Sequence, residues 1–326
     1  MNGGATSLVI CAFLLLLISA CGTVDRVAMN ASSTLLSRAS NEMETEGNWE
    51  NIRSALIGNL KFIEGLWYVD PGNEELIAAL IKGYAAQAFV IDETLYLEDQ
   101  LQGQEQSVHR GDAILNYSRA MRYGQEFLKV HGLTYQNLMM KMNEEKGVFK
   151  LLEDKMSSSN EALQSMLFYA QSLSSLINLQ KNRQEMLAQL PVAKAMFDWV
   201  CSKKADISFG ACDLFYASYE AGRPKMLGGD PARARKIFID GINRFPHNWL
   251  MRAMAVQFYA LPMSDEKFYG EQKLFLETAA KWHDDEMNWR PNIDGAPAFA
   301  ERRLRLFQAL AIKRFEIIKR HEKTIF

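Results

Sequence analysis

A histidine next to three acidic residues is the first feature of this sequence that could support chemistry. Residues 283–286 read His-Asp-Asp-Glu, and all four are metal-ligand types. Adjacent residues on a helix point about 100° apart, so these side chains cannot converge on one ion. We expect a solvated turn there, without a metal. The remaining histidines stand singly beside polar residues, as surface or capping histidines do: His109, His131, His247 and His321.

Familiar catalytic motifs are missing from the chain. It has no phosphate-binding glycine loop, no HExxH, no nucleophile elbow and no CxxC. We therefore expect neither enzymatic activity nor a cofactor.

The thiol of Cys21 is the best candidate for covalent modification. Residues 8–20 (LVICAFLLLLISA) form an apolar run. The run is shorter than the about 20 residues that span a bilayer, but it suits a signal peptide. It ends in small residues before Cys21, which resembles the bacterial lipobox, where the cysteine is acylated and the preceding bond is cut. We predict a signal peptide over 1–20 and a lipidated tether over 21–48. The alternative is a short uncleaved anchor.

The lipobox resemblance implies where the protein works. It implies three acyl chains on Cys21, more than stable anchoring needs, and a location in the bacterial periplasm. Position 22 is Gly rather than Asp, so the retention signal of inner-membrane lipoproteins is missing and the outer membrane is favoured.

A second pair of cysteines could form a disulfide, because an envelope location permits one. Cys201 is predicted near the end of one helix and Cys212 near the start of the next. A tight helical hairpin would bring the two opposite each other only if both side chains point inward. The sequence leaves open whether they are bonded or are two buried free thiols.

The overall composition excludes several classes of protein. The chain has 326 residues, 37 Lys+Arg and 39 Asp+Glu, and a formal net charge of -2. This balance gives no general attraction to phosphate backbones, so we expect no nucleic-acid partner. With 8 Pro and 48% hydrophobic residues the chain is neither disordered nor collagenous, and its length suffices for one large core or two smaller ones.

The elements that must position these residues are predicted to be helices. Apolar residues recur at helical spacing, as at Leu56, Leu60 and Ile63, and no sustained alternation of apolar and polar residues follows the signal. The prolines fall where helices can begin or end. We predict one all-α domain over 49–326, and we expect Gly58 and Asn59 to interrupt its first helix.

Self-similar spacing indicates that the helices form hairpins. Ala234, Phe238, Gly241 and Pro246 have the spacing of the second helix of a tetratricopeptide (TPR) repeat. We predict a compact α-solenoid of degenerate TPR-like hairpins, interrupted by extra helices between Ala120 and Ala193. The weaker matches are Ala113, Tyr117 and Ala120, then Ala193, Phe197 and Val200, and a worn form at Ile63, Leu66 and Pro71.

Several short stretches make the resemblance more specific. They are residues 59–66 (NLKFIEGL), 70–73 (DPGN), 82–85 (KGYA), 175–179 (SLINL) and 225–231 (KMLGGDP). Together they resemble the T component associated with TRAP transporters, a family of periplasmic TPR lipoproteins. The resemblance implies a cavity or pore, assembly as a homotrimer, and association with a periplasmic solute-binding protein that feeds a TRAP permease.

Two surfaces are candidates for contact with such a partner. Counting from the prolines places Glu75, Lys82 and Gln257 on the inner face of the repeats. The last helix, from Phe299 onward, has an apolar stripe and basic side chains on its other faces, so we predict a C-terminal capping helix. The alternative is a basic face that meets anionic lipid or an acidic partner. The basic residues are Arg302, Arg303, Arg305, Lys313, Arg314, Lys319 and Arg320.

The function that fits these expectations is a non-enzymatic accessory lipoprotein. It would bind the solute-binding protein of a TRAP transporter and hand over a hydrophobic or carboxylate ligand. The alternatives are a TPR assembly factor in the envelope and a helical envelope hydrolase or transferase.

Overall fold

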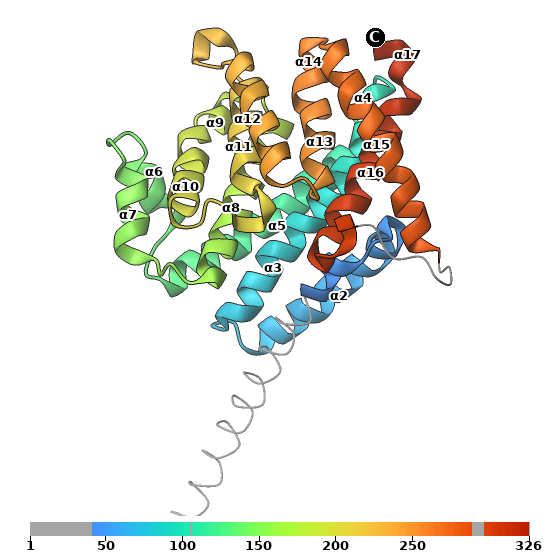
Figure 1. Ribbon diagram of the computed structural model, residues 1–326. Coiled ribbons are helices and arrows are strands. Elements are labelled where there is room, and N and C mark those ends of the chain that lie inside the picture. Colours follow the sequence, from blue (N-terminus) through green and yellow to red (C-terminus); the bar gives the residue numbers. More distant parts are fainter. Residues whose placement is uncertain (1–40, 105, 289–296, 326) are drawn as a thin grey trace, which may run out of the picture.

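The computed structural model describes residues 41–104, 106–288 and 297–325 and shows an all-helical body (Figure 1). This part of the chain contains helices and no strand, so the predicted all-α fold is confirmed. The predicted signal peptide, Cys21 and the tether up to residue 40 lie outside the described residues.

The first half of the body combines four long helical stretches, over residues 49–69, 74–101, 108–130 and 160–179, with shorter helices. Its elements are η1 (Asn41–Thr45), α2 (Trp49–Val69), α3 (Glu74–Ala86), the π-helical η2 (Gln87–Asp92), α4 (Glu93–Leu101), α5 (Val108–Val130), α6 (Tyr135–Lys141), α7 (Gly147–Lys155), α8 (Asn160–Leu179), α9 (Gln184–Leu187) and α10 (Leu190–Lys203).

The second half is built mostly from helices that run up and down beside one another. Its elements are η3 (Ile207–Phe209), α11 (Ala211–Gly222), η4 (Lys225–Leu227), α12 (Pro231–Arg244), α13 (Trp249–Ala255), the π-helical η5 (Val256–Ala260), α14 (Leu261–Met263), α15 (Glu266–Met287), η6 (Pro297–Phe299), η7 (Arg302–Leu304), α16 (Arg305–Arg320) and α17 (Glu322–Ile325).

Local sequence signals explain where several helices begin. Asn48 precedes α2, and its side chain accepts hydrogen bonds from the backbone N–H groups of Glu50 and Asn51. Asp230 caps α12 in the same way, with Pro231 in the first turn. These caps satisfy N–H groups that have no partner within the helix.

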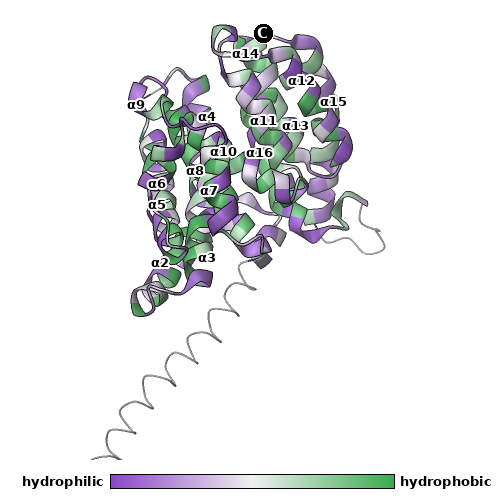
Figure 2. Ribbon diagram, turned by 90° about the vertical axis from the view of Figure 1, so that its left-hand side faces the viewer, coloured by the Kyte–Doolittle hydropathy of each residue, from purple (hydrophilic) through white to green (hydrophobic). Residues whose placement is uncertain are grey.

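Two hydrophobic clusters fill the body, and the continuous helix of residues 74–101 separates them. In the C-terminal cluster, α12, α13, α15 and α16 pack with α2 and with Leu76, Leu80 and Tyr84. In the N-terminal cluster, α5–α8 and α10 pack with Ile77 and Ile81. Figure 2 shows α5, α6, α8 and α10 in one group of helices and α12, α13, α15 and α16 in another beside it.

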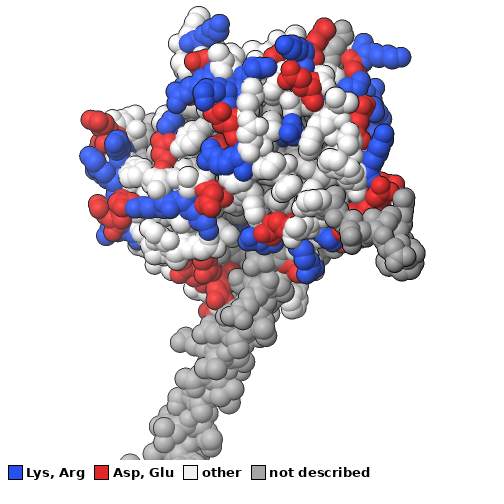
Figure 3. Space-filling model, viewed as in Figure 1, with Lys and Arg blue, Asp and Glu red and all other residues white. Residues whose placement is uncertain are grey.

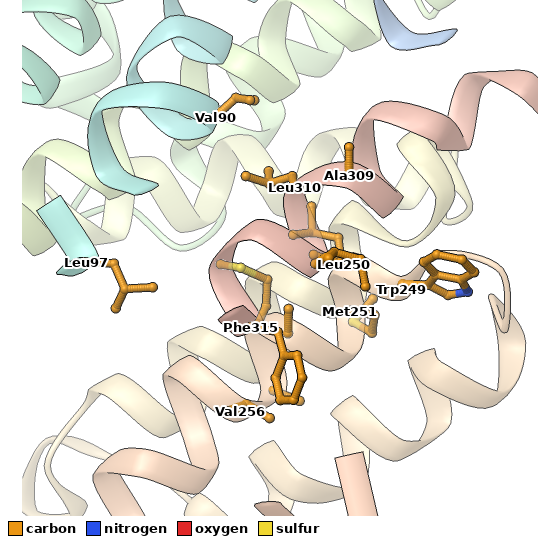
Figure 4. Packing of buried hydrophobic residues seen from close by; sticks show 14 of the residues in the cluster. Val90, Leu97, Trp249, Leu250, Met251, Val256, Ala309, Leu310 and Phe315 are labelled. Atoms are coloured by element: carbon orange, nitrogen blue, oxygen red, sulfur yellow. The ribbon is translucent and has the colours of Figure 1, made fainter. Parts of the chain in front are cut away.

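Helix α16 is the centre of the C-terminal cluster. In Figure 4, Ala309, Leu310 and Phe315 lie between α13 and the segment that carries Val90 and Leu97. The sequence predicts that the basic residues of this capping helix lie on solvated faces. For Arg314 that prediction is wrong. Arg314 is fully buried, and α16 contacts α2, α4, α13 and α15.

The residues predicted to pack between helices are mostly buried. Phe238 is fully buried, and a Cβ added at Gly241 would lie 3.2 Å from Asp213 on α11 and 3.2 Å from Met251 on α13. Pro246 is exposed just after α12. Close helix contact at these positions agrees with hairpin packing, and the assignment to TPR repeats stays a prediction. Also buried are Ala113, Tyr117, Ala120, Ala193, Phe197, Val200 and Ala234.

Two local expectations are wrong. Helix α2 runs without interruption through Gly58 and Asn59, because Leu56 and Leu60 on either side are buried and hold the helix in place. Residues 283–286 lie in α15 rather than in a turn, and the Nε2 atom of His283 is 2.8 Å from the carbonyl oxygen of Gly47.

Candidate functional site

The three residues predicted on the inner face lie in two different environments. Lys82 on α3 forms an ion pair with Glu44 of η1, with 2.6 Å between Nζ and Oε1, and its ammonium lies 6.0 Å from the ring of Phe168. Gln257 lies in η5, where its Oε1 accepts a hydrogen bond from buried Arg314. Both residues are half-buried, and each is held by a partner within its own chain.

The third of these residues, Glu75, belongs to an acidic group at the start of α3. Burial raises the pKa of Glu161 on α8, and the charges of Glu75 and Glu74 add to this effect. Glu74 is also 3.1 Å from Nε2 of His131. Figure 3 shows acidic side chains gathered over this lower end of the body. A surface of this kind favours a basic partner.

A buried polar cluster joins the two halves of the molecule, and Arg314 is its centre. The guanidinium donates to Thr94 Oγ1 at 3.1 Å, to Gln257 Oε1 at 3.0 Å and to the carbonyl oxygen of Phe89. It also lies over the ring of Phe89, 4.3 Å from the centroid. These contacts tie α16 both to the helix of residues 74–101 and to η5.

Both π-helical segments contribute to this cluster. Phe89 belongs to η2 and Gln257 to η5. A π-helical turn is rare, and such turns are often found at functional sites. The widened turns present a carbonyl group and a side-chain amide to the same guanidinium.

The acidic partner of Arg314 is Glu93, with 4.0 Å between Nη2 and Oε2. Burial raises the pKa of Glu93, and the charge of Arg314 opposes that rise. The Oε1 atom of Glu93 and the hydroxyl group of Tyr117 are buried and lack a hydrogen-bond partner among the described residues. The pair is therefore a loosely satisfied buried ion pair, whose contribution to stability depends on both members.

A second buried carboxylate lies next to this pair in the sequence. Asp92 accepts hydrogen bonds from Asn116 at 2.7 Å and from Gln87 at 3.2 Å. Burial raises the pKa of Asp92 from its ordinary value of 3.8 to about 6. The side chain of Asp92 consequently changes charge near pH 6 rather than near pH 4.

The group of the polar cluster that could bind a ligand is the Arg314 guanidinium. A guanidinium is well suited to bind a carboxylate in two-point geometry, but the Arg314 donors already face protein acceptors. No thiol or imidazole takes part in the hydrogen bonds described for Arg314 and Asp92. The described side chains also include no group of three or more His, Cys, Asp and Glu residues suited to a metal ion.

Sequence analysis missed the role of Arg314, although a signal was present. Arg314 follows Ala311 by three residues and precedes Ile318 by four, so it lies on the same side of the helix as the apolar stripe. Glu93, its partner, carries no comparable signal. The pairing joins residues that are far apart in the chain, which spacing within one helix cannot show.

The predicted cysteine pair lies between α10, at the end of the first half of the body, and α11, in the second half. The structure joins Cys201 of α10 to Cys212 of α11 by a disulfide, with 5.9 Å between the Cα atoms. A shallow cleft of about 390 Å³ lies beside it. The carboxylates in this cleft are already paired, because Tyr216 donates to Asp198 and Arg244 to Asp213.

Two general findings bear on where the protein acts. None of the described helices combines the length and the hydropathy that a membrane span requires. The charges on the face shown in Figure 3 are interspersed, with no broad basic field that would attract nucleic acid.

Comparison with known proteins identifies the family. Residues 46–326 match the family model of the TRAP transporter T-component. No curated protein matches the chain. The match begins directly after η1 and covers the rest of the described body, and the suspected resemblance is confirmed. The chain therefore belongs to the TRAP transporter T-component family.

Proposed function

We propose that this protein is a non-enzymatic accessory lipoprotein that binds the periplasmic solute-binding protein of a TRAP transporter. The observation that carries the proposal is the family match over residues 46–326. A transporter-associated component without its own membrane-spanning helix in the described residues can act by holding a partner. The ligand handed over would be hydrophobic or a carboxylate.

The proposal places the protein in the periplasm, attached to a membrane by lipid on Cys21. Attachment confines the body near the membrane and raises its effective concentration at a membrane-borne permease. Cells fed a radioactive fatty acid should label the wild-type chain but not Cys21→Ala. Equal labelling of the two would contradict the lipid anchor without touching the binding proposal.

The proposed contact surface includes Glu75 and Lys82 on α3. Support comes from the acidic group to which Glu75 belongs, because complementary charge favours specific association. The family resemblance also suggests that copies assemble as a homotrimer, which would align several such surfaces.

Affinity purification from envelopes tests the binding proposal. The wild-type chain should retain the solute-binding protein, and Glu75→Lys and Lys82→Glu should each retain less of it. Lys82→Glu also breaks the ion pair with Glu44, so a thermal melt must show that the variant is folded. Lys236→Glu reverses a highly exposed charge on α12 and is the matched control. Equal retention by all variants would remove α3 from the contact surface.

A further inference from the structure

The disulfide between α10 and α11 lines a cleft instead of lying within the core. Cys201 is half-buried, whereas Cys212 is only 3% exposed. Both cysteines are among the residues that line the cleft of about 390 Å³ beside the bond. A disulfide is cleaved by a thiolate that approaches one of its sulfur atoms directly, so access decides whether the bond reacts. A thiol that enters this cleft finds Cys201 to be the more accessible of the two.

The position of Cys212 makes it the better leaving group. Cys212 is the second residue of α11, which begins at Ala211 after the cap residue Gly210. The N–H groups of the first helical turn have no partner within the helix and form the positive end of its dipole. This environment favours a thiolate at Cys212, and a sulfur that is stable as a thiolate leaves a disulfide faster.

The charges that line the cleft do not repel an incoming thiolate. Asp213 pairs with Arg244, with 2.9 Å between Oδ1 and Nη2. Asp198 accepts a hydrogen bond from Tyr216 and pairs with Lys194. Each carboxylate among the residues that line the cleft is thus matched by a cation, so an anionic sulfur can approach the bond.

The loop between the two cysteines gains freedom when the bond opens. Ser208 and Phe209 have φ angles of 48° and 55°, and Gly210 follows with a φ of 103°. Glycine adopts this left-handed region readily, but serine and phenylalanine do so only at a cost. Because the disulfide holds the two ends of the loop together, its cleavage lets Ser208 and Phe209 relax.

Other contacts keep the two helices together while the bond is open. Phe197 of α10 stacks on Phe215 of α11, with 3.7 Å between the ring centroids. The hydroxyl group of Tyr216 on α11 donates to Asp198 on α10 at 2.8 Å. The two free thiols therefore stay near each other and can form the bond again.

We propose that this disulfide is an exchange site for a dithiol reductant of the cell envelope, with Cys201 as the attacked sulfur. A thiolate of the reductant bonds to Sγ of Cys201, the S–S bond breaks, and Cys212 leaves with the electron pair and takes up a proton from water. The second thiolate of the reductant then attacks its own sulfur in the mixed disulfide and releases Cys201. The protein disulfide is thereby reduced to two thiols, and the dithiol is oxidised to a disulfide. The exchange switches the covalent link between α10 and α11 on and off.

Peptide mass spectrometry of the folded full chain tests which sulfur is attacked. The oxidised chain is exposed briefly to glutathione without denaturant, quenched with acid and alkylated. Glutathione should be found on Cys201 and the alkyl group on Cys212, with a preference of at least about tenfold over the reverse pattern. Equal amounts of the two patterns, or glutathione mainly on Cys212, would overturn the inference.

The rate of reduction tests whether the bond opens in the folded state. A bond that reacts only after global unfolding is reduced at least about 10³-fold more slowly in the folded chain than in urea, because folded domains have unfolding constants of that order or smaller. We expect the folded chain to be less than about 100-fold slower, with a rate proportional to the glutathione concentration. A slowing of about 10³-fold or more would overturn the inference.

A substitution in the cleft separates access from stability. Ala205 is exposed and lines the cleft. Ala205→Trp should slow the reduction by at least about tenfold, because the ring covers the approach to Cys201, and should leave the melting temperature of the oxidised chain unchanged. Lys181→Trp, at an exposed position in the turn after α8 that does not line the cleft, is the matched control and should not slow the reduction. Equal rates for the two variants would show that the cleft is not the route and would overturn the inference.

Discussion

The C-terminal cluster and the Arg314 cluster beside it are equally buried but are held together in different ways. Phe238 lies among apolar and small residues, where each contact contributes a little and a loss scales with the volume removed. Arg314 instead depends on a few directed hydrogen bonds and on one charge, Glu93. The comparison indicates that stability should fall gradually as volume is removed from the apolar cluster. In the polar cluster around Arg314, the loss of one member should remove most of the stabilisation.

Removal of Arg314 should have the largest effect. Arg314→Ala leaves Glu93 buried and unpaired and also opens a cavity, so we expect at least the about 3 to 5 kcal/mol typical of a broken buried ion pair. Urea melts of the wild type and the variant measure this difference. Lys313→Ala, which loses only a partly exposed ion pair with Glu50, is the neighbouring control and should cost about 0 to 1 kcal/mol.

A double variant sharpens the interpretation of that loss. Arg314→Met combined with Glu93→Gln removes both charges and keeps most of the volume, so it should be clearly more stable than Arg314→Ala. If the double variant is no more stable, the loss comes from the missing guanidinium hydrogen bonds rather than from an unpaired charge on Glu93.

Truncation of Phe238 should rank next. Phe238→Ala should cost about 3 to 5 kcal/mol, the range for a large-to-small change in a core. Phe62→Ala is the exposed counterpart and should change stability by no more than about 0.5 kcal/mol in dilute protein. A chemical melt of Phe238→Ala that shows a loss below about 1 kcal/mol would mean that the packing between α11, α12 and α13 is wrongly described.

The disulfide should contribute about 3 kcal/mol, because it restricts the conformations that the unfolded chain can adopt. The bonded cysteines are 11 residues apart. The variant with both Cys201→Ser and Cys212→Ser should melt at the same temperature with and without reductant, whereas the wild type should melt lower when reduced. An unchanged wild-type melt would reject a bond that stabilises the protein.

The smallest expected effect is the pH response of Asp92. Its raised pKa means that the folded protein holds a proton that the unfolded chain releases, so its contribution to stability is present below pH 3.8 and is lost as the pH rises through about 6. Asp92→Asn lacks this titration. The variant should therefore gain about 2 kcal/mol on the wild type between pH 4 and pH 6.5. Parallel pH profiles of stability would show that Asp92 titrates normally.

The sequence predicts those parts of the fold that depend on spacing within one helix. Ala234, Phe238 and Gly241 are near neighbours on α12, so their burial follows from the helical period. The π-helical segments and the pairing of Arg314 with Glu93 depend on helices that meet only in the folded chain. For this reason sequence analysis placed Arg314 on a solvated face.

Other differences have local physical causes. Gly58 was expected to interrupt α2, but a glycine costs a helix only about 1 kcal/mol, which the burial of Leu56 and Leu60 outweighs. The partner contacts of Glu75, Lys82 and Gln257 stay predictions. Of these three, Gln257 already uses its Oε1 atom to accept a hydrogen bond from Arg314.

The most direct test of the central claim is the sedimentation velocity of the full chain mixed with the solute-binding protein of its TRAP transporter. Our account predicts a faster-sedimenting complex at tens of micromolar, with both proteins in the complex and no turnover of ester or glycoside substrates by the chain. Separate sedimentation of the two proteins, together with hydrolysis of such a substrate, would contradict the accessory function and favour an envelope hydrolase.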